Sequence, residues 1–169
     1  HVSADSQFRS GFACFVGRPN AGKSTLTNAL VGEKVAITSS RPQTTRHAIR
    51  GLVHRENAQL VLVDTPGLHR PRTLLGERLN NLVRATWSEV DTVGMCLPAD
   101  ERIGPGDKFL IRELAGLRRK PVLAIATKTD LVSPARLAEH LTSIAAVGAD
   151  LGMDWAQVVP VSAVAGDQV

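Results

Sequence analysis

A glycine-rich stretch near the N-terminus carries the clearest chemistry in the sequence. The nine residues GRPNAGKST match the pattern G-x-x-x-x-G-K-[ST], in which Lys23 and Ser24 follow a glycine-rich loop. Gly17 and Gly22 let the backbone curl so that its N–H groups can bind phosphate oxygens. Lys23 would bridge the β- and γ-phosphates of a nucleotide, and the Ser24 hydroxyl suits Mg²⁺, which takes oxygen ligands. The residues expected to contact the nucleotide here are Asn20, Ala21, Gly22, Lys23, Ser24 and Thr25.

A carboxylate at the end of an apolar run gives a second motif for the same site. The run LVLV is followed by DTPG, which contains Asp64 and Gly67. At the carboxyl edge of a strand beside the phosphate loop, Asp64 can hold Mg²⁺ through water, and the Gly67 N–H can bind the γ-phosphate. A lone DxxG is common by chance, but its place after GRPNAGKST and after an apolar run makes it specific.

Two later motifs indicate which base is bound. In ATKTD, Asp130 could accept hydrogen bonds from both N1–H and the exocyclic amine of guanine, a pair that adenine cannot offer. Lys128 would lay its alkyl stem along the base. A helix N-cap is the alternative role for Asp130, but VSA further on places a backbone N–H at Ala163 for the guanine oxygen. An ATPase is therefore disfavoured, and the expected base-binding residues are Thr127, Lys128, Asp130, Ser162 and Ala163.

The elements that must position these residues follow from hydrophobic periodicity. Short, nearly continuous apolar runs alternate with amphipathic stretches, which is typical of a parallel sheet covered by helices on both faces. Two runs separated by HRENAQ predict an antiparallel hairpin at one edge. We therefore expect a three-layer α/β/α sandwich with a mostly parallel sheet. The predicted strands are 12–16, 48–53, 60–63, 92–97, 122–126 and 158–161, and the predicted helices are 23–31, a stretch within 76–90, 107–117 and 134–147.

Composition narrows the class of protein. The chain has 169 residues, 43% of them hydrophobic, which suits one globular domain. Its net charge of +4 is weak support for a nucleic-acid partner, because a solvated arginine-rich surface is the better explanation. Cys14 and Cys96 lie in apolar runs, so we expect buried free thiols and a reducing compartment. No apolar run reaches the ~18 residues of a membrane span, and no signal peptide is recognised, so we expect a cytoplasmic protein.

The motif order is that of a G domain, and longer stretches resemble the Era family of GTPases, in the translation-factor-related (TRAFAC) class. The resemblance runs from about Phe12 to Ala163, and SRPQTTRH is its most diagnostic stretch because generic G domains lack it. It implies the P-loop NTPase fold, GTP or GDP and Mg²⁺ as cofactors, and hydrolysis of GTP to GDP and phosphate. Residues 1–169 would then be the G domain. We expect it to end before the last covering helix, because only SAVAGDQV follows the last predicted strand.

The same resemblance implies partners. Members of the family act in assembly of the small ribosomal subunit and bind its rRNA through a C-terminal KH domain, which we expect to be absent from this chain because no GXXG clamp is found. The resemblance also allows peripheral association with the inner face of the cell membrane, and a monomer is expected. Alternatives are a related GTPase of tRNA modification or large-subunit assembly, which SRPQTTRH argues against, and a nucleotide-binding module with negligible turnover.

Catalysis needs a substitute for a missing glutamine. Ras-type enzymes orient the attacking water with a glutamine directly after DxxG, where this chain has Leu68. By resemblance to potassium-activated GTPases, Asn20 would ligate K⁺ together with backbone carbonyls of the loop carrying SRPQTTR. The cation would replace an arginine finger, whose worth is roughly 10³–10⁵ in rate. A hydrogen bond of Asn20 within its own turn is the alternative.

A loop threonine completes the predicted metal site. Thr45 is the expected second hydroxyl ligand of Mg²⁺, with Thr44 as the alternative, in a loop that would order around the γ-phosphate. The expected catalytic residues are thus Asn20, Lys23, Thr45 and Gly67, and the expected metal ligands are Ser24, Thr45 and Asp64.

Two stretches depart from the family pattern. Thr127 stands where the family usually carries asparagine. Because threonine is shorter, we expect a weakened tether between the base-binding residues and the phosphate loop, and a lower nucleotide affinity. The stretch 94–107, GMCLPADERIGPGD, also differs from the usual strand end, and the sequence alone gives it no function.

Overall fold

One mixed sheet of six strands forms the centre of the molecule. The computed structural model describes residues 9–31, 49–55, 58–63, 74–117 and 120–162. The strand order is β2-β3-β1-β4-β5-β6, and every neighbouring pair is parallel except β2 and β3. The predicted antiparallel hairpin at one edge is therefore confirmed. The strands are β1 (Arg9–Val16), β2 (Ile49–Arg55), β3 (Ala58–Val63), β4 (Thr92–Pro98), β5 (Val122–Thr127) and β6 (Gln157–Pro160).

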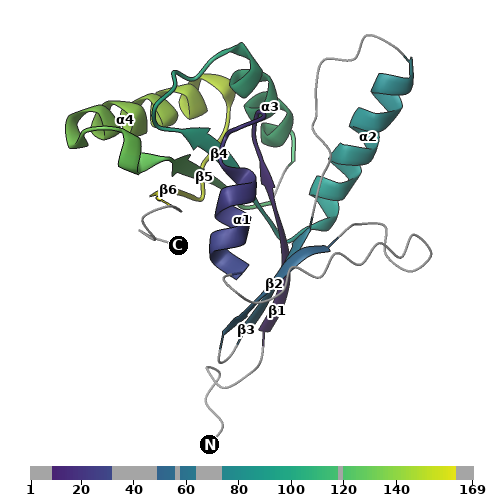
Figure 1. The fold of residues 1–169 in the computed structure, drawn as a ribbon. Helices are drawn as coiled ribbons and strands as arrows, with labels where there is room; N and C mark the ends of the chain where they lie inside the picture. The colour runs from purple at the N-terminus through teal and green to yellow at the C-terminus, as the bar shows by residue number, and fades with distance from the viewer. Residues whose placement is uncertain (1–8, 32–48, 56–57, 64–73, 118–119, 163–169) are drawn as a thin grey trace, which may run out of the picture.

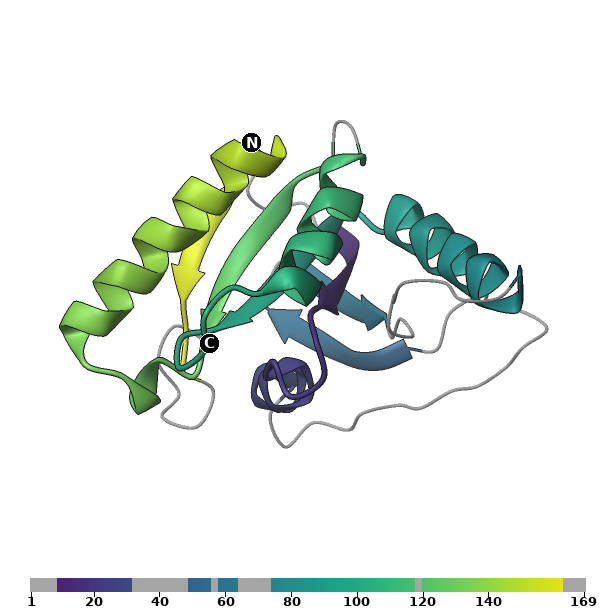
Figure 2. The same ribbon diagram turned by 90° about the horizontal axis from the view of Figure 1, so that it is seen from above.

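Helices cover both faces of the sheet, as predicted. Helix α1 lies against one face and the three others lie against the opposite face (Figures 1 and 2). The right-handed crossovers between parallel strands require this distribution. The helices are α1 (Lys23–Val31), α2 (Leu74–Glu89), α3 (Pro105–Ala115) and α4 (Pro134–Leu151), and a short 3₁₀ turn, η2 (Thr129–Leu131), follows β5.

Local sequence signals set the boundaries of the later helices. Helix α4 begins at Pro134, after Ser133 whose hydroxyl accepts a hydrogen bond from the Arg136 N–H at 3.2 Å, and ends at Gly152 with φ +74°. Both features are common helix boundaries, because serine caps the free N–H groups and glycine adopts the left-handed conformation at low cost. Helix α3 likewise begins with a proline, Pro105.

The core is divided by the sheet into two layers. Alternate residues of β1 point to opposite faces, so Cys14 packs beneath α2, α3 and α4 while Ala13 packs on the other face. The larger layer includes Trp87 of α2 and Ile144 of α4, both almost fully buried. Strand β4 is buried from its second residue to its last, as expected for a strand with helices on both faces.

The two cysteines are free and buried, which confirms the prediction. Burial raises the pKa of each thiol, Cys14 and Cys96, to about 12, because the charged thiolate is disfavoured away from water. Within the described part of the chain, no helix combines the length and the apolar character that crossing a membrane requires.

Candidate nucleotide-binding site

The phosphate loop, residues 17–24, joins β1 to α1, as its motif requires. Both of its glycines are needed. A Cβ at Gly17 would lie 3.0 Å from the Cys96 carbonyl oxygen, and a Cβ at Gly22 would lie 3.2 Å from the Cβ of Thr127. Gly22 also has φ +96°, in the region that favours glycine. The loop can therefore approach the ends of β4 and β5 only because these positions have no side chain.

The lysine of the motif spans the loop. Lys23 Nζ donates a hydrogen bond to the Gly17 carbonyl oxygen at 2.6 Å, so the ammonium group lies across the loop from its first residue. Ser24 and Thr25, in the first turn of α1, are exposed. Helix α1 has no acidic residue in that turn, so its positive N-terminal field is available to an anion.

Two residues of the site hold a left-handed backbone. Asn20 has φ +66° and Lys128 has φ +59°, and no other non-glycine residue that the structure describes has a positive φ. They are in contact, because Lys128 Nζ donates a hydrogen bond to the Asn20 carbonyl oxygen at 2.7 Å. Uncommon backbone conformations cluster at functional sites, and asparagine tolerates this one better than most residues. The backbone itself thus favours asparagine at position 20.

The side chain of Asn20 does not support the alternative that asparagine is needed here for a hydrogen bond within its own turn. No hydrogen bond joins its amide group to another residue of the described ranges, so a bond within its own turn is not formed there. The amide oxygen is on an exposed residue at the tip of the phosphate loop.

Thr127 contacts the phosphate loop. Its hydroxyl donates a hydrogen bond to the Ala21 carbonyl oxygen at 2.6 Å, and its side chain is buried. Threonine therefore keeps a tether between the base-binding residues and the phosphate loop, and the expected lower nucleotide affinity stays a prediction. The short side chain reaches because Gly22 brings the loop to within van der Waals distance of the end of β5.

The base-recognition aspartate is held in place by the neighbouring strand. Asp130 lies in η2, and its Oδ1 accepts a hydrogen bond from the Ser162 hydroxyl at 2.9 Å. Ser162 is fully buried, whereas Asp130 is exposed. The alternative role of Asp130 as the N-cap of the next helix is wrong, because Ser133 caps α4. An exposed carboxylate with one oxygen fixed can present the other to a ligand.

The structure brings most of the described site residues together, through hydrogen bonds from Thr127 and Lys128 to the carbonyl oxygens of residues 21 and 20 and through the bond between Asp130 and Ser162. Of the predicted metal ligands, Ser24 alone lies in the described ranges. Within those ranges, no group of three or more histidine, cysteine, aspartate or glutamate side chains could hold a metal ion. The predicted site residues that lie outside the described residues are Thr45, Asp64, Gly67 and Ala163.

Sequence reasoning missed one contact of the phosphate loop. Arg18 binds Asp107 and Glu101, which lie in the stretch 94–107, for which no function was predicted. One signal in the sequence could have indicated it. Pro105 follows Gly104, and Asp107 lies three residues after that glycine, a spacing that predicts a helix N-terminus with an inward-facing carboxylate.

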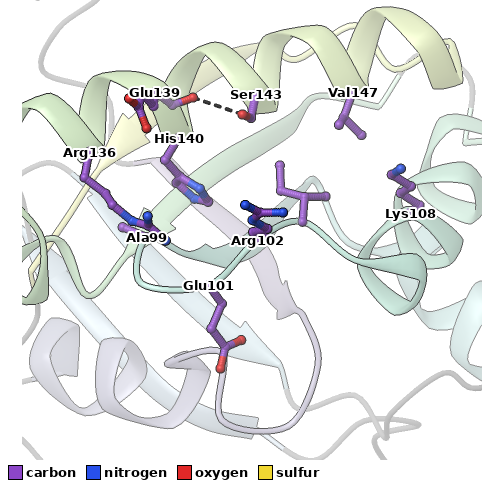
Figure 3. A pocket seen from close by; sticks show the side chains of 10 residues that line it. Ala99, Glu101, Arg102, Lys108, Arg136, Glu139, His140, Ser143 and Val147 are labelled. Carbon is purple, nitrogen blue, oxygen red and sulfur yellow. Dashed lines mark hydrogen bonds between the residues drawn. The ribbon is translucent and has the colours of Figure 1, made fainter.

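A polar pocket of about 320 Å³ lies between α4 and the residues that follow β4 (Figure 3). Arg102 and Arg136 line it, together with His140, whose Nε2 is 3.1 Å from the Leu97 carbonyl oxygen. Glu101 is at its rim and points away from the other labelled side chains. The pocket has charges of both signs and no glycine-rich backbone loop, so its chemistry differs from that of the phosphate loop.

Comparison with known proteins places the chain in a family. A family model described as "50S ribosome-binding GTPase" matches residues 12–128. GTPase Era of Streptomyces coelicolor is 69% identical over 166 residues, which are 98% of this chain and 52% of that protein. GTPase Era of Mycobacterium leprae is 61% identical over 166 residues, 97% of this chain and 54% of that protein. The chain thus spans about half the length of the curated relatives it matches.

Solved structures agree with the sequence comparisons. The crystal structure of Era in complex with MgGDPNP and nucleotides 1506–1542 of 16S ribosomal RNA has a TM-score of 0.73 at 31% identity, over 95% of this chain and 53% of that one. The apo elongation factor SelB of Methanococcus maripaludis, with a TM-score of 0.66 at 18% identity over 95% of this chain and 31% of that one, shows the fold alone. The predicted P-loop fold and the predicted resemblance to Era are both confirmed. The chain belongs to the GTPase family that the matching model describes, and it is similar to Era proteins along nearly all of its length.

Proposed function

We propose that this chain is the guanine-nucleotide-binding domain of an Era-like GTPase, which binds GTP and hydrolyses it to GDP and phosphate. The observation that carries the proposal is the pair of hydrogen bonds from Thr127 to the Ala21 carbonyl and from Lys128 to the Asn20 carbonyl. They fix the base-binding residues against the phosphate loop, so one ligand can contact both. A nucleotide is such a ligand, with its phosphates at one end and its base at the other.

Each described residue has a role in binding. The N–H groups of residues 20–25 and the start of α1 would bind the phosphates, and Lys23 would exchange its bond to the Gly17 carbonyl for phosphate oxygens. Asp130 would select guanine through its free carboxylate oxygen, while Ser162 keeps the carboxylate oriented. The stem of Lys128 would lie along the base, and we assign the guanine oxygen to the Ala163 N–H.

The Ser24 hydroxyl of the phosphate loop is a suitable ligand for Mg²⁺. Ser24 is exposed in the first turn of α1, and a hydroxyl oxygen is a ligand that Mg²⁺ accepts. We propose Thr45 and Asp64 as further ligands. When bound, the cation supplies charge neutralisation between the β- and γ-phosphates. The similar Era structure was solved with MgGDPNP, which supports this assignment.

For hydrolysis we propose that Asn20 helps to bind K⁺, because Leu68 cannot orient the attacking water. The exposed Asn20 amide, which forms no hydrogen bond within the described residues, supports a ligand role. The left-handed backbone gives a competing reason for asparagine, so the ion must be tested directly. Gly67 and Thr45 are the proposed γ-phosphate contacts.

Phosphate release from GTP tests the catalytic part. The purified protein should release phosphate with Mg²⁺ and K⁺, and more slowly when Na⁺ replaces K⁺ at the same ionic strength. Equal rates in the two salts would contradict the role of K⁺ and leave hydrolysis intact. No release in either salt would favour the alternative of a binding module with negligible turnover. ATP should not displace a fluorescent GDP, and displacement by ATP would contradict guanine selection.

For biological role we propose assembly of the small ribosomal subunit, with its rRNA bound through a KH domain outside this chain. The similar Era structure contains 16S ribosomal RNA, whereas the family model's description names the 50S subunit. Sedimentation of a longer protein that contains this chain and such a KH domain, with purified 30S and 50S subunits and a GTP analogue, separates the two. Binding to 50S alone would favour the large-subunit alternative. We further propose a cytoplasmic monomer that associates peripherally with the membrane.

A further inference from the structure

An arginine inside the phosphate loop is held by carboxylates from another part of the chain. Arg18 Nε donates a hydrogen bond to Asp107 Oδ1 at 2.7 Å, and Arg18 Nη2 donates one to Glu101 Oε2 at 2.9 Å. Asp107 is 1% exposed, whereas the Glu101 side chain is half exposed. The two carboxylates therefore contribute differently. Loss of Arg18 would leave the buried Asp107 charge without its partner, which is costly, whereas the exposed pair with Glu101 contributes little.

The Asp107 carboxylate is also held by a contact that does not involve Arg18. Its second oxygen, Oδ2, accepts a hydrogen bond from the Gly104 N–H at 3.0 Å, at the start of α3. A carboxylate in the first turn is further stabilised by the helix N-terminus. A Cβ at Gly106 would lie 3.0 Å from Arg18 Cδ, so the glycine between Pro105 and Asp107 leaves room for the aliphatic part of the arginine side chain. Asp107 is thus a rigid anchor.

The anchor acts on the backbone that faces the phosphates. The Arg18 carbonyl oxygen accepts a hydrogen bond from the Ala21 N–H at 3.1 Å, which closes the turn at the tip of the loop. A shift of Arg18 would therefore move Asn20 and Gly22 as well. The hydrogen bond with Asp107 raises the pKa of the Arg18 guanidinium, so this side chain stays positively charged.

We propose that Asp107 is a positioning residue for the phosphate loop, acting through Arg18, and that the stretch 94–107 exists in part to supply it. The inference rests on the proposed function, because the property it controls is affinity for guanine nucleotide. It also assigns Arg18 to holding the loop: with its guanidinium bound to two carboxylates, it does not serve as an arginine finger.

The competing explanation is that Asp107 only caps α3. Asp107→Asn separates the two roles, since the amide oxygen can still accept from the Gly104 N–H while the charged pair with Arg18 is lost. Arg18→Gln removes the other partner and leaves the cap intact. The same helix provides a matched control: Glu113 Oε2 accepts from Arg84 Nε at 2.8 Å, a partly buried pair outside the nucleotide site, so Glu113→Gln removes a similar charge pair.

The experiment measures equilibrium affinity for a fluorescent GDP, together with thermal unfolding without nucleotide, on purified wild-type protein and variants. D107N and R18Q should each weaken GDP binding about tenfold, as expected for loss of one charge-assisted hydrogen bond. The double variant should be no weaker than the weaker single one, because both remove the same interaction. E113Q should stay within about twofold of wild type, since no charged pair at the site is lost.

The outcomes separate the inference from the proposed function. Wild-type affinity in D107N would show that the charged pair with Arg18 does not position the loop, and it would overturn the inference while guanine binding stands. A lower unfolding temperature in D107N with unchanged affinity would assign the pair to stability alone and overturn the inference as well. Multiplied losses in the double variant would overturn it as well. If D107N does not fold, R18Q alone decides, and wild-type affinity in R18Q overturns the inference. A wild-type protein that does not bind GDP would overturn the proposed function and the positioning role together.

Discussion

The phosphate loop is held from two sides, and the two sides work differently. On the side of β5, Thr127 and Lys128 donate hydrogen bonds to carbonyl oxygens of the loop backbone. On the side of α3, the loop's own Arg18 donates to Asp107 and Glu101. The first connection depends on side chains outside the loop and on no side chain within it. The second depends on a specific residue type in the loop and a specific residue type in its partner.

This difference explains why the sequence suggested a tether at Thr127, although not its geometry, and suggested no contact for Arg18. Contacts to backbone carbonyls do not constrain the loop's side chains, so they come with the motif itself. A pair of side chains far apart in the chain, as Arg18 and Asp107 are, leaves no pattern of spacing. The two sides should also respond differently to salt, because the partly exposed Arg18–Glu101 pair is screened and the neutral Thr127 hydrogen bond is not.

The largest expected effect comes from Thr127→Val. It removes the buried hydroxyl and leaves the Ala21 carbonyl without its donor, so we expect a loss of about 1–3 kcal/mol in the free energy of unfolding. We expect GDP affinity to fall roughly 10- to 100-fold, since 1.4 kcal/mol is tenfold. Denaturant unfolding and titration with fluorescent GDP measure the two.

Thr142→Val is the matched control for this prediction. The Thr142 hydroxyl also donates to a backbone carbonyl, that of Ala138 at 2.9 Å, but at an exposed position on α4. We expect no change in GDP affinity. If Thr127→Val also left affinity unchanged, the β5 side would not hold the loop.

Alkaline pH tests the core beneath the loop. The pKa of each buried thiol is raised to about 12, so in the unfolded state the thiols deprotonate first, near pH 9. Their contribution to stability is complete below pH 9 and is lost as pH rises toward 12. By pH 10, each thiol should lower the free energy of unfolding by roughly 1 kcal/mol.

Cys14→Ala and Cys96→Ala should each remove part of that pH dependence, measured by denaturant unfolding from pH 8 to pH 10. Cys14 lies in the layer beneath α2–α4 and Cys96 lies beneath the phosphate loop, so the pair compares the two core layers. An unfolding free energy that is independent of pH in this range would contradict burial of the thiols.

A smaller effect is expected from Lys128→Met. The variant keeps an unbranched apolar stem for the base and removes the ammonium that donates to the Asn20 carbonyl. We expect GDP affinity to fall about fivefold to tenfold, less than a buried hydrogen bond from a charged group contributes, because this bond is exposed to solvent. A titration of Lys128→Ala beside it should show a further loss from the stem, and identical affinities of the two variants would contradict a contact with the base.

Glu101→Gln should have the smallest effect. Its pair with Arg18 is partly exposed on both sides, so we expect GDP affinity to fall by no more than about twofold. The difference from wild type should vanish at high salt. A loss as large as that of Asp107→Asn, in the same titration at low and high salt, would mean that the exposed carboxylate and not the buried one anchors Arg18.

Much of the fold followed from the sequence. Apolar runs predicted all six strands, and their ends moved by at most three residues, as at β1, which begins at Arg9 and not at Phe12. The hairpin at the sheet edge followed from two such runs with a polar turn between them. Helix ends were less accurate: α4 continues to Leu151 because Gly152, not the end of the apolar periodicity at Val147, stops it.

Contacts within the site followed less well. The motifs identified Lys23 and Asp130, because their spacing to neighbouring strands is fixed. Comparison with a family pattern did not show the contact of Thr127, because side-chain length alone does not show how closely Gly22 lets two loops approach. The left-handed conformations of Asn20 and Lys128 could not be derived from residue type either, since they depend on the hydrogen bond that joins the two segments.

The central claim is that the phosphate loop binds guanine nucleotide and is held by contacts from both β5 and α3. The most direct test is to measure the affinity of fluorescent GDP for wild-type protein, Thr127→Val, Asp107→Asn and the double variant. We predict that wild type binds GDP, that each single variant binds more weakly, and that the double variant binds more weakly than either single one, because the two connections hold the loop through different side chains. Wild-type affinity in both single variants, or no GDP binding by wild type, would contradict the claim.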